Sequence, residues 1–286
     1  MSEPIVAPTI AAVRSAVRNA RAGQGDRRIA LVPTMGALHA GHLALVERAR
    51  DIADVVVVSI FVNPLQFGQN EDLSSYPRSL ERDVAALADV GADIVFTPTE
   101  SEMYPNGPSA TRITGGAAAG MLEGASRRGH FEGVLTVVAK LLHIVGPDVV
   151  VFGQKDAQQV FLVQRMVRDL DFPVRVEVVD TVRDEDGLAL SSRNARFDPR
   201  QRSVARTVHT ALEAAVSAAD RGIDACVAAA QSALMGEPLI QLDYLAVVEP
   251  GTFQPVDDGF RGKVRILIAA RVGDVRLIDN DLAHLG

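Results

Sequence analysis

Two histidines three residues apart, His39 and His42, stand in a short stretch with the right residue types for phosphate chemistry. The stretch reads Pro-Thr-Met-Gly-Ala-Leu-His-Ala-Gly-His over residues 33–42, between an apolar run and a segment with helical spacing. If a helix begins here, both imidazoles share one face of its N-terminus, where free N–H groups and the helix dipole favour an anion. Imidazoles there can stabilise the charge that grows on a leaving pyrophosphate.

A purely structural role for these histidines is the alternative interpretation. One ring could cap the helix and the other could be an ordinary buried group, which is the commoner situation for a single histidine. Here, however, the pair follows Gly36 and lies between a predicted strand and a predicted helix. The H-x-G-H pattern resembles the signature of the nucleotidyltransferase superfamily, which handles ATP at the α-phosphate, and we favour that interpretation.

A second polar cluster also follows an apolar run, at residues 148–152. Lys155 supplies a point charge for phosphate oxygens, and Asp156 could accept hydrogen bonds from ribose hydroxyls. The neutral amides of Gln158 and Gln159 suit hydroxyl and carboxylate groups. A solvated lysine beside a helix cap is the alternative for this cluster.

A third cluster, Ser191, Ser192 and Arg193, combines two hydroxyls with a guanidinium and could donate to phosphate. Such a motif is more often an ordinary loop than a site. Because the carboxyl ends of parallel strands share one edge of a sheet, we expect the clusters that follow strands to lie at the same edge.

Strands and helices alternate over the first two thirds of the chain, which predicts a Rossmann-like, doubly wound parallel sheet of the α/β class. Residues 55–62 are apolar on both faces, as expected of a central strand. A helix capped by Thr9 precedes the sheet. The predicted strands are 29–32, 55–62, 94–96, 148–152 and 174–179, and the predicted helices cover 43–52, 80–90, 134–145 and 157–167.

The pattern changes near residue 181 and predicts a smaller α+β lid domain. We therefore expect a Rossmann-like domain over 1–181 and a smaller lid domain over 182–286. Asp198 and Pro199 form a strong helix start, and Asp224 is expected to open a second helix. Strands are predicted over 239–248, 263–272 and 275–278. The polar segment 68–77 is predicted to be a mobile lid beside a strand end.

Composition and charge exclude several classes of protein. The chain of 286 residues carries 29 basic and 36 acidic residues, a net charge of −7, which disfavours nucleic-acid binding. Its single cysteine, Cys226, rules out an intrachain disulfide and is expected to be a buried apolar group. Neither a signal peptide nor a membrane span is predicted, so we expect a cytoplasmic protein.

Six motifs in order make the resemblance specific. They are P-T-M-G-x-L-H-x-G-H, F-V-N-P-x-Q-F, Y-P-R, H-F-x-G-V, G-x-K-D-x-Q-Q and S-S-R-N, and their order and spacing agree with the pattern from Ile29 to about Pro199. Together they resemble the pantothenate synthetases, and the C-terminal third resembles them more loosely. The resemblance implies a cytoplasmic homodimer that joins pantoate to β-alanine with ATP, through a pantoyl adenylate, and releases AMP and pyrophosphate. It also implies that the domain over 1–181 binds ATP and pantoate.

The resemblance also implies roles for individual residues. His42 matches the acid of the adenylation step, and His39 and Lys155 are further catalytic candidates. Gln66 and Gln159 match the positions that hold pantoate, and Gln66 also faces β-alanine. Mg²⁺ is expected on the ATP phosphates, with Asp83 as a candidate ligand. The implied ATP-binding residues are Met35, Gly36, Ala37, Leu38, His39, Ala40, Gly41, His42, Gly153, Gln154, Lys155, Asp156, Val182, Leu190, Ser191, Ser192 and Arg193.

Three positions depart from the family pattern. Gln154 stands where glutamate is usual, Ala157 where an aromatic residue is usual, and Leu190 where methionine is usual. The change at 154 keeps size and hydrogen bonding but removes a charge. Two rival functions are a nucleotidyltransferase that leaves the nucleotide on its product and a noncatalytic ATP- or RNA-binding module. The amide-rich pocket and second domain argue against the first, and the acidic charge and retained histidines argue against the second.

Overall fold

The computed structural model describes residues 3–22, 26–68, 73 and 79–286. Its internal contacts divide the chain into two compact units. Unit 1 comprises Met1–Gln154 and Gln158–Asp180, and unit 2 comprises Lys155–Ala157 and Thr181–Gly286. Most of the segment predicted to be a lid, and the Y-P-R motif at 76–78, lie outside the described residues.

Unit 1 is built on a six-stranded parallel sheet with the strand order β1-β4-β3-β2-β5-β6. The central strands are rich in valine and leucine and almost entirely buried, as a strand covered on both faces requires. The sheet confirms the predicted α/β class. Its strands are β1 (Ile5–Ala7), β2 (Ile29–Thr34), β3 (Val55–Ile60), β4 (Ile94–Phe96), β5 (Val149–Gly153) and β6 (Arg175–Val179).

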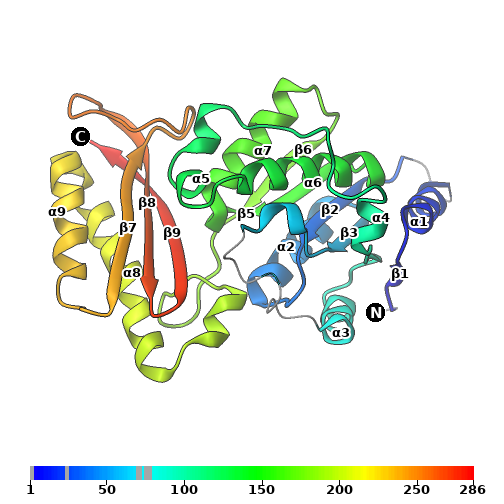
Figure 1. Cartoon of the computed structure of the whole chain (residues 1–286), viewed down its shortest axis with the longest axis horizontal. Coiled ribbons are helices and arrows are strands. Elements are labelled where there is room, and N and C mark those ends of the chain that lie inside the picture. The colour runs from blue at the N-terminus through cyan, green and yellow to red at the C-terminus, as the bar shows by residue number, and fades with distance from the viewer. Residues whose placement is uncertain (1–2, 23–25, 69–72, 74–78) are drawn as a thin grey trace. The chain divides into compact units, whose positions relative to one another are not determined.

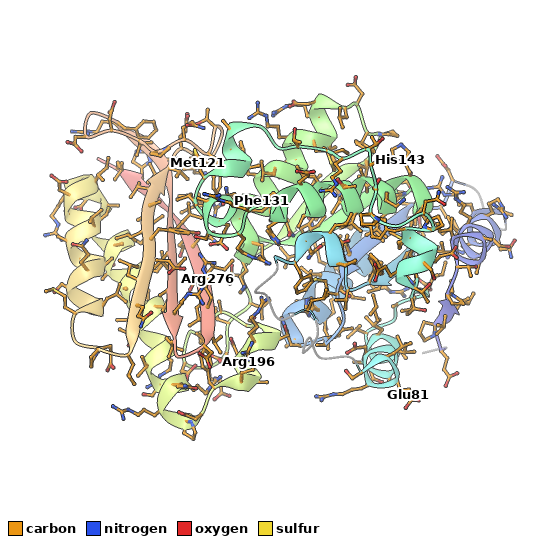
Figure 2. All side chains as sticks on the ribbon, in the orientation of Figure 1. Glu81, Met121, Phe131, His143, Arg196 and Arg276 are labelled. Atoms are coloured by element: carbon orange, nitrogen blue, oxygen red, sulfur yellow. The ribbon has the colours of Figure 1, made fainter. Side chains whose placement is uncertain are left out.

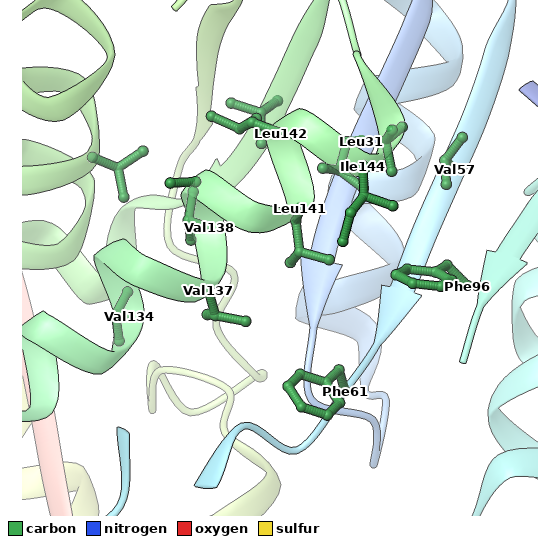
Figure 3. Close-up of a cluster of buried hydrophobic side chains, with 14 of the residues drawn as sticks. Leu31, Val57, Phe61, Phe96, Val134, Val137, Val138, Leu141, Leu142 and Ile144 are labelled. Carbon is green, nitrogen blue, oxygen red and sulfur yellow. The ribbon is translucent and has the colours of Figure 1, made fainter. Parts of the chain in front are cut away.

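Helices cover both faces of this sheet, because alternate strand residues belong to separate apolar layers (Figure 1). Leu31 and Val57 pack in the layer formed with α1, α6 and α7, whereas Val32 and Val58 pack with α2 and α3. Figure 3 shows Leu141 and Ile144 of α6 in the first layer. The helices of unit 1 are α1 (Ile10–Ala22), α2 (Ala40–Ile52), α3 (Leu80–Asp89), α4 (Glu100–Met103), α5 (Glu123–Ser126), α6 (His130–Val145) and α7 (Ala157–Asp169, whose first residue is grouped with unit 2).

The strand order reverses between β2 and β5. From β2 the chain builds the sheet through β3 to β4, and it then returns to β5 and β6 on the opposite side of β2. The register pairs Leu31 with Val150, so the segments that follow β2 and β5 leave the sheet at neighbouring positions. Ligands of open parallel sheets bind at such a reversal, outside the carboxyl ends of the strands.

Unit 2 packs two helices on a three-stranded antiparallel sheet, β7 (Ile240–Val248), β8 (Gly262–Val272) and β9 (Val275–Leu285). The helices are α8 (Pro199–Ser217) and α9 (Ile223–Leu234). The small side chains of Ala205 and Ala211 on α8 are buried in the core of this unit. Cys226 is 0% exposed in this core, and burial raises the pKa of its thiol. Among the described residues, no helix has the length and apolar composition needed to cross a membrane.

Several predicted boundaries shift in the structure. Strand β9 continues to Leu285, past the predicted end at 278, because the polar residues Asp279 and Asn280 are buried and hydrogen-bonded within unit 2. A short strand, β1, was missed, since three residues are too few to show a periodic pattern. Helix α9 begins at Ile223 with Gly222 as its cap, so Asp224 lies inside the first turn.

The predicted start of α8 is confirmed in detail. Asp198 Oδ1 accepts the N–H of Gln201 at 2.7 Å, and Oε1 of Gln201 accepts the N–H of Asp198 at 3.2 Å. Pro199 occupies the first helical position, where its missing N–H has no partner to lose. Two of the N–H groups left over at the helix end are therefore satisfied by this reciprocal pair.

We predict that Asp198→Ala lowers the free energy of unfolding by about 1 kcal/mol, because it removes the cap acceptor of α8. Urea unfolding of the full chain, followed by far-ultraviolet circular dichroism, measures this change. Asp224→Ala is the matched control, since that aspartate does not cap its helix. An equal loss in the two variants would show that helix dipoles, and not the cap, account for the effect.

Candidate active site

A tight turn connects β2 to α2, and the side chain of Asp83 holds it. Gly36 (φ 81°) and Ala37 (φ 51°) both adopt left-handed backbone conformations, so the chain reverses within two residues. Asp83 on α3 is 3% exposed and accepts the N–H groups of Ala37 and Leu38, each at 2.9 Å. A Cβ at residue 36 would lie 3.0 Å from Oδ2 of Asp83, so glycine allows this approach.

This arrangement bears on the candidate magnesium ligand. Each oxygen of the Asp83 carboxylate accepts a backbone N–H, and Ser79 Oγ lies 3.5 Å from Oδ1. A buried carboxylate that satisfies two backbone donors explains the aspartate without a metal, so the structure favours a turn-holding role. Glu81, on the same turn of α3 and labelled in Figure 2, is exposed.

His39 and His42 form a reciprocal cap at the N-terminus of α2. Nδ1 of His39 accepts the N–H of Gly41 at 3.2 Å, and Nδ1 of His42 accepts the N–H of His39 at 3.4 Å. The ring centroids are 4.1 Å apart. Because a backbone N–H only donates, Nδ1 is the unprotonated nitrogen of each neutral ring, and Nε2 carries the hydrogen.

The pair therefore combines features of both interpretations made from the sequence. The structural one expected a helix cap, and His39 is that cap. The chemical one expected two imidazoles together at a helix N-terminus, and the rings are in contact there. Capping through Nδ1 leaves the hydrogen on Nε2, so the cap does not conflict with donation to a phosphate. The chemical roles of His39 and His42 stay predictions.

Gln66 lies close to this turn, at the end of the short 3₁₀ helix η1 (Pro64–Gln66) that follows β3. The residue is 9% exposed. Oε1 of Gln66 accepts a hydrogen bond from Nδ2 of Asn63 at 3.0 Å, and Nε2 lies 3.0 Å from Sδ of Met35. The structure thus brings together two residues, Met35 and Gln66, that were predicted to bind different substrates.

The backbone of Gln66 is held by α6. His130 Nδ1 lies 2.8 Å from the carbonyl oxygen of Gln66, and Arg127 Nη1 lies 2.9 Å from Nε2 of His130. Since arginine only donates and a carbonyl only accepts, the ring is neutral with its hydrogen on Nδ1. A Cβ on Gly133 would lie 2.3 Å from the carbonyl oxygen of Leu65, so glycine is required where α6 meets η1. This contact explains the H-F-x-G-V motif.

The adjacent residues Gln158 and Gln159 differ in burial and in hydrogen bonding, although the sequence suggested the same role for both. Nε2 of Gln158 donates to the carbonyl oxygens of Ala118 and Met121, at 2.7 and 2.9 Å, and its Oε1 accepts the N–H of Glu123. Gln158 is 3% exposed and serves the backbone of unit 1. Gln159, the predicted pantoate residue, is half-buried. Gly153 is the last residue of β5 and Gln154 follows it, beside the end of β2.

Two predicted ATP residues of unit 2, Val182 and Leu190, flank a hairpin that turns at 184–187. The N–H of Leu190 donates to the carbonyl oxygen of Val182 at 3.0 Å, so these two predicted residues lie side by side. Ser191 caps the short helix η4 (Ser192–Arg196) by accepting the N–H of Arg193 at 3.3 Å. The clustering of Ser191, Ser192 and Arg193 therefore has a local structural cause.

Two ion pairs fix this hairpin. Arg183 binds Asp279 through both guanidinium nitrogens, at 2.6 and 2.9 Å. Burial lowers the pKa of Arg183, but the hydrogen bond and charge of Asp279 outweigh it, so the net shift is upward. Asp184 is paired with Arg202. In the same unit, Lys155 is half-buried, with its carbonyl oxygen accepting a bond from Asn280 at 3.0 Å, and Asp156 is exposed.

Sequence reasoning missed several residues around Gln66. Asn63 appeared only inside a motif and without a role, and Tyr104 was not singled out at all. His130 was noticed inside a motif without a role. The signal for Asn63 and His130 was their place inside two of the six motifs, whereas Tyr104 becomes visible only when its hydroxyl is seen 2.8 Å from Oδ1 of Asn63.

The fold and these contacts define a nucleotide-binding α/β protein: a parallel sheet, with a helix N-terminus capped by histidines at the reversal of strand order. A family profile described as pantoate-beta-alanine ligase matches residues 5–282. The chain therefore belongs to the pantoate-beta-alanine ligase family and is an enzyme of the ligase class.

Individual relatives agree over nearly the whole chain. It is 57% identical over 268 residues to a pantothenate synthetase of Leifsonia xyli, covering 94% of this chain and 93% of that protein. A crystal structure of pantothenate synthetase from Thermus thermophilus is 47% identical, with a TM-score of 0.90 over 97% of this chain and 98% of that one. A Francisella tularensis pantoate-beta-alanine ligase, solved with beta-gamma ATP and beta-alanine, is 37% identical, with a TM-score of 0.80 and coverages of 98% and 97%.

We predict that Asp83→Asn lowers the free energy of unfolding by about 1–3 kcal/mol, because the amide has one acceptor where two backbone donors must be satisfied. Urea unfolding in the presence of EDTA measures the change without divalent metal. Glu81→Gln is the matched control and should change the value by less than about 0.5 kcal/mol. Unchanged stability combined with lost magnesium-dependent ATP binding would instead identify Asp83 as a metal ligand.

Proposed function

We propose that this enzyme condenses pantoate with β-alanine in two steps. In the first, the pantoate carboxylate attacks the α-phosphorus of ATP, which forms pantoyl adenylate and releases pyrophosphate. In the second, the β-alanine amine attacks the acyl carbon, and AMP leaves as the amide bond forms. Positioning and charge stabilisation contribute most to such a displacement.

The observation that carries this proposal is the histidine cap at the start of α2. Both Nδ1 atoms accept backbone N–H groups, so both neutral rings have their hydrogen on Nε2. Nε2–H groups beside a helix N-terminus donate to phosphate oxygens, and their attraction strengthens as negative charge builds on the departing pyrophosphate. We assign His42 as the acid of this step, with His39 beside it, and the turn from Met35 to His42 as the ATP contact of unit 1.

Gln66 supports the pantoate assignment. Its Oε1 is occupied by Asn63, so its Nε2 is the end of the amide suited to donate to a carboxylate or hydroxyl oxygen. Pantoate carries both kinds of acceptor. We assign Gln66 and Gln159 to pantoate, and Gln66 also to β-alanine.

Further roles complete the proposal. In unit 1, Gly153 and Gln154 are assigned to ATP. In unit 2, the half-buried Lys155 is the proposed catalytic cation, and Asp156, Val182, Leu190, Ser191, Ser192 and Arg193 are the proposed ATP-binding residues. Mg²⁺ is proposed to be held mainly by ATP phosphates and water, as is usual for this ion on nucleotide triphosphates.

We also propose that the enzyme is a cytoplasmic homodimer, as the family resemblance implies. Sedimentation of the full chain at micromolar concentration tests the assembly, and a monomer would refute it.

Exchange of labelled pyrophosphate into ATP tests the order of steps. With pantoate present and β-alanine absent, the enzyme should catalyse exchange, because adenylate formation needs only the carboxylate. β-Alanine alone should support none. Exchange that requires β-alanine would overturn the two-step scheme and the roles given to Gln66 and Gln159.

The same exchange separates the two roles of His42. His42→Ala should slow exchange on the order of 10²-fold or more, since it removes a donor to the developing charge. His42→Gln is the decisive variant, because glutamine at this position can still accept the cap N–H. We expect it to fold normally and remain slow, and His143→Gln, at an exposed site on α6, to exchange normally. Recovery of activity in His42→Gln would show that His42 is not the acid, because an amide can accept and donate hydrogen bonds but cannot transfer a proton.

A further inference from the structure

Tyr104 is a buried tyrosine in unit 1 that touches a residue beside the proposed pantoate site. It follows α4 and is 5% exposed. Its hydroxyl donates to Oδ1 of Asn63 at 2.8 Å, and its ring lies against Phe61, with centroids 6.1 Å apart. Nζ of Lys140 on α6 lies over the ring, 5.5 Å from its centroid. The hydroxyl is therefore held in one direction.

Two backbone groups decide which way the Asn63 amide faces. Its Nδ2 donates to the carbonyl oxygen of Gly133 at 3.1 Å, and its Oδ1 accepts the N–H of Leu65 at 3.3 Å. A carbonyl cannot donate and an N–H cannot accept, so the reversed amide would lose both bonds. The Tyr104 hydroxyl adds a third bond to the same amide.

The direction of Asn63 then fixes the direction of Gln66. The remaining hydrogen on Nδ2 of Asn63 points to Oε1 of Gln66 at 3.0 Å. Nε2 of Gln66 is consequently turned toward Met35, whose thioether sulfur is only a weak acceptor. A donor on a residue that is 9% exposed, opposite a weak acceptor, is suited to a ligand oxygen.

We infer that Tyr104 is a positioning residue for acid recognition: through Asn63 it holds the Gln66 amide with Nε2 directed toward the carboxylate or hydroxyl oxygen of the substrate. This role rests on the proposed function of Gln66 and adds a residue to it. The path Tyr104–Asn63–Gln66 is buried along its length, so water does not easily replace any of its bonds.

The Tyr104 hydroxyl keeps its hydrogen well above neutral pH. Burial, and to a smaller extent the charge of Glu100, raises the pKa of Tyr104 to about 12. The hydroxyl therefore stays protonated below that pH and continues to donate to Asn63. The contribution of Tyr104 should not vary with pH between about 6 and 10.

Tyr104→Phe tests the inference, because it removes the hydroxyl and keeps the ring. We expect the pantoate concentration for half-maximal pyrophosphate exchange to rise about three- to tenfold, the effect of losing one neutral hydrogen bond. The value for ATP should change less than about twofold, and the pantoate effect should be equal at pH 6.5 and 9. Tyr244→Phe, the same change in unit 2, is the matched control.

A double-mutant cycle shows whether Tyr104 acts through Gln66. In a Gln66→Ala background, Tyr104→Phe should have no further effect on pantoate. A full effect in that background, or an equal rise for ATP, would overturn the positioning role. Asn63→Asp tests the same path without changing the ring of Tyr104. The aspartate places a second acceptor opposite Oε1 of Gln66, which should turn the Gln66 amide over. Pantoate binding should then be weaker than in Tyr104→Phe. A normal pantoate response in Asn63→Asp would also overturn the inference.

Pyrophosphate exchange by the wild-type enzyme distinguishes a failure of this inference from a failure of the proposed function on which it rests. Without pantoate-dependent exchange in wild type, the proposed function fails and the positioning role falls with it. With normal wild-type exchange and an unchanged Tyr104→Phe, the inference alone fails.

Discussion

The two hydrogen bonds from the N–H groups of Ala37 and Leu38 to Asp83 are the contact on which the site of unit 1 depends. They hold a turn in which two consecutive residues, one of them an alanine, adopt left-handed conformations at some cost in backbone energy. That turn sets where α2 begins, and so where the histidine cap lies. A buried carboxylate on α3, a glycine that admits it and a helix N-terminus thus form one unit, in which each part fixes the geometry of the next.

The substrate side of the site follows the same logic with neutral groups. Helix α6 meets η1 closely because Gly133 has no side chain, and this contact lets a backbone carbonyl orient Asn63. The ring of His130 is held in a single tautomer, and its Nδ1–H donates to the carbonyl oxygen of Gln66. Amides have no charge to select a partner, so their direction has to be set by obligate donors and acceptors of the backbone. Preorganised dipoles of this kind need not reorient when a charged ligand arrives.

The sheet, most helices and the position of the histidines could be predicted from the sequence, because they depend on periodic burial and local turn chemistry. The start of α8 at Asp198 is an example in which every determinant lies within four residues. The contact of Asp83 with Ala37 and that of Tyr104 with Asn63 could not be predicted, since each bridges segments 40 or more residues apart. The end of β9 was missed for a related reason: buried Asp279 looks like a surface residue until Arg183 is placed beside it. The different roles of the adjacent Gln158 and Gln159 also could not be predicted, because they depend on which backbone groups each side chain can reach.

The solitary cysteine gives this chain a built-in chemical reporter. Cys226 is completely buried in the core of unit 2, and it is the only thiol of the chain. A thiol reagent can modify it only when that core opens, so the labelling rate measures the opening free energy of unit 2. Unit 1 contributes no signal because it has no cysteine. The native sequence therefore allows the local stability of one unit to be followed, with and without substrates, and no residue has to be replaced.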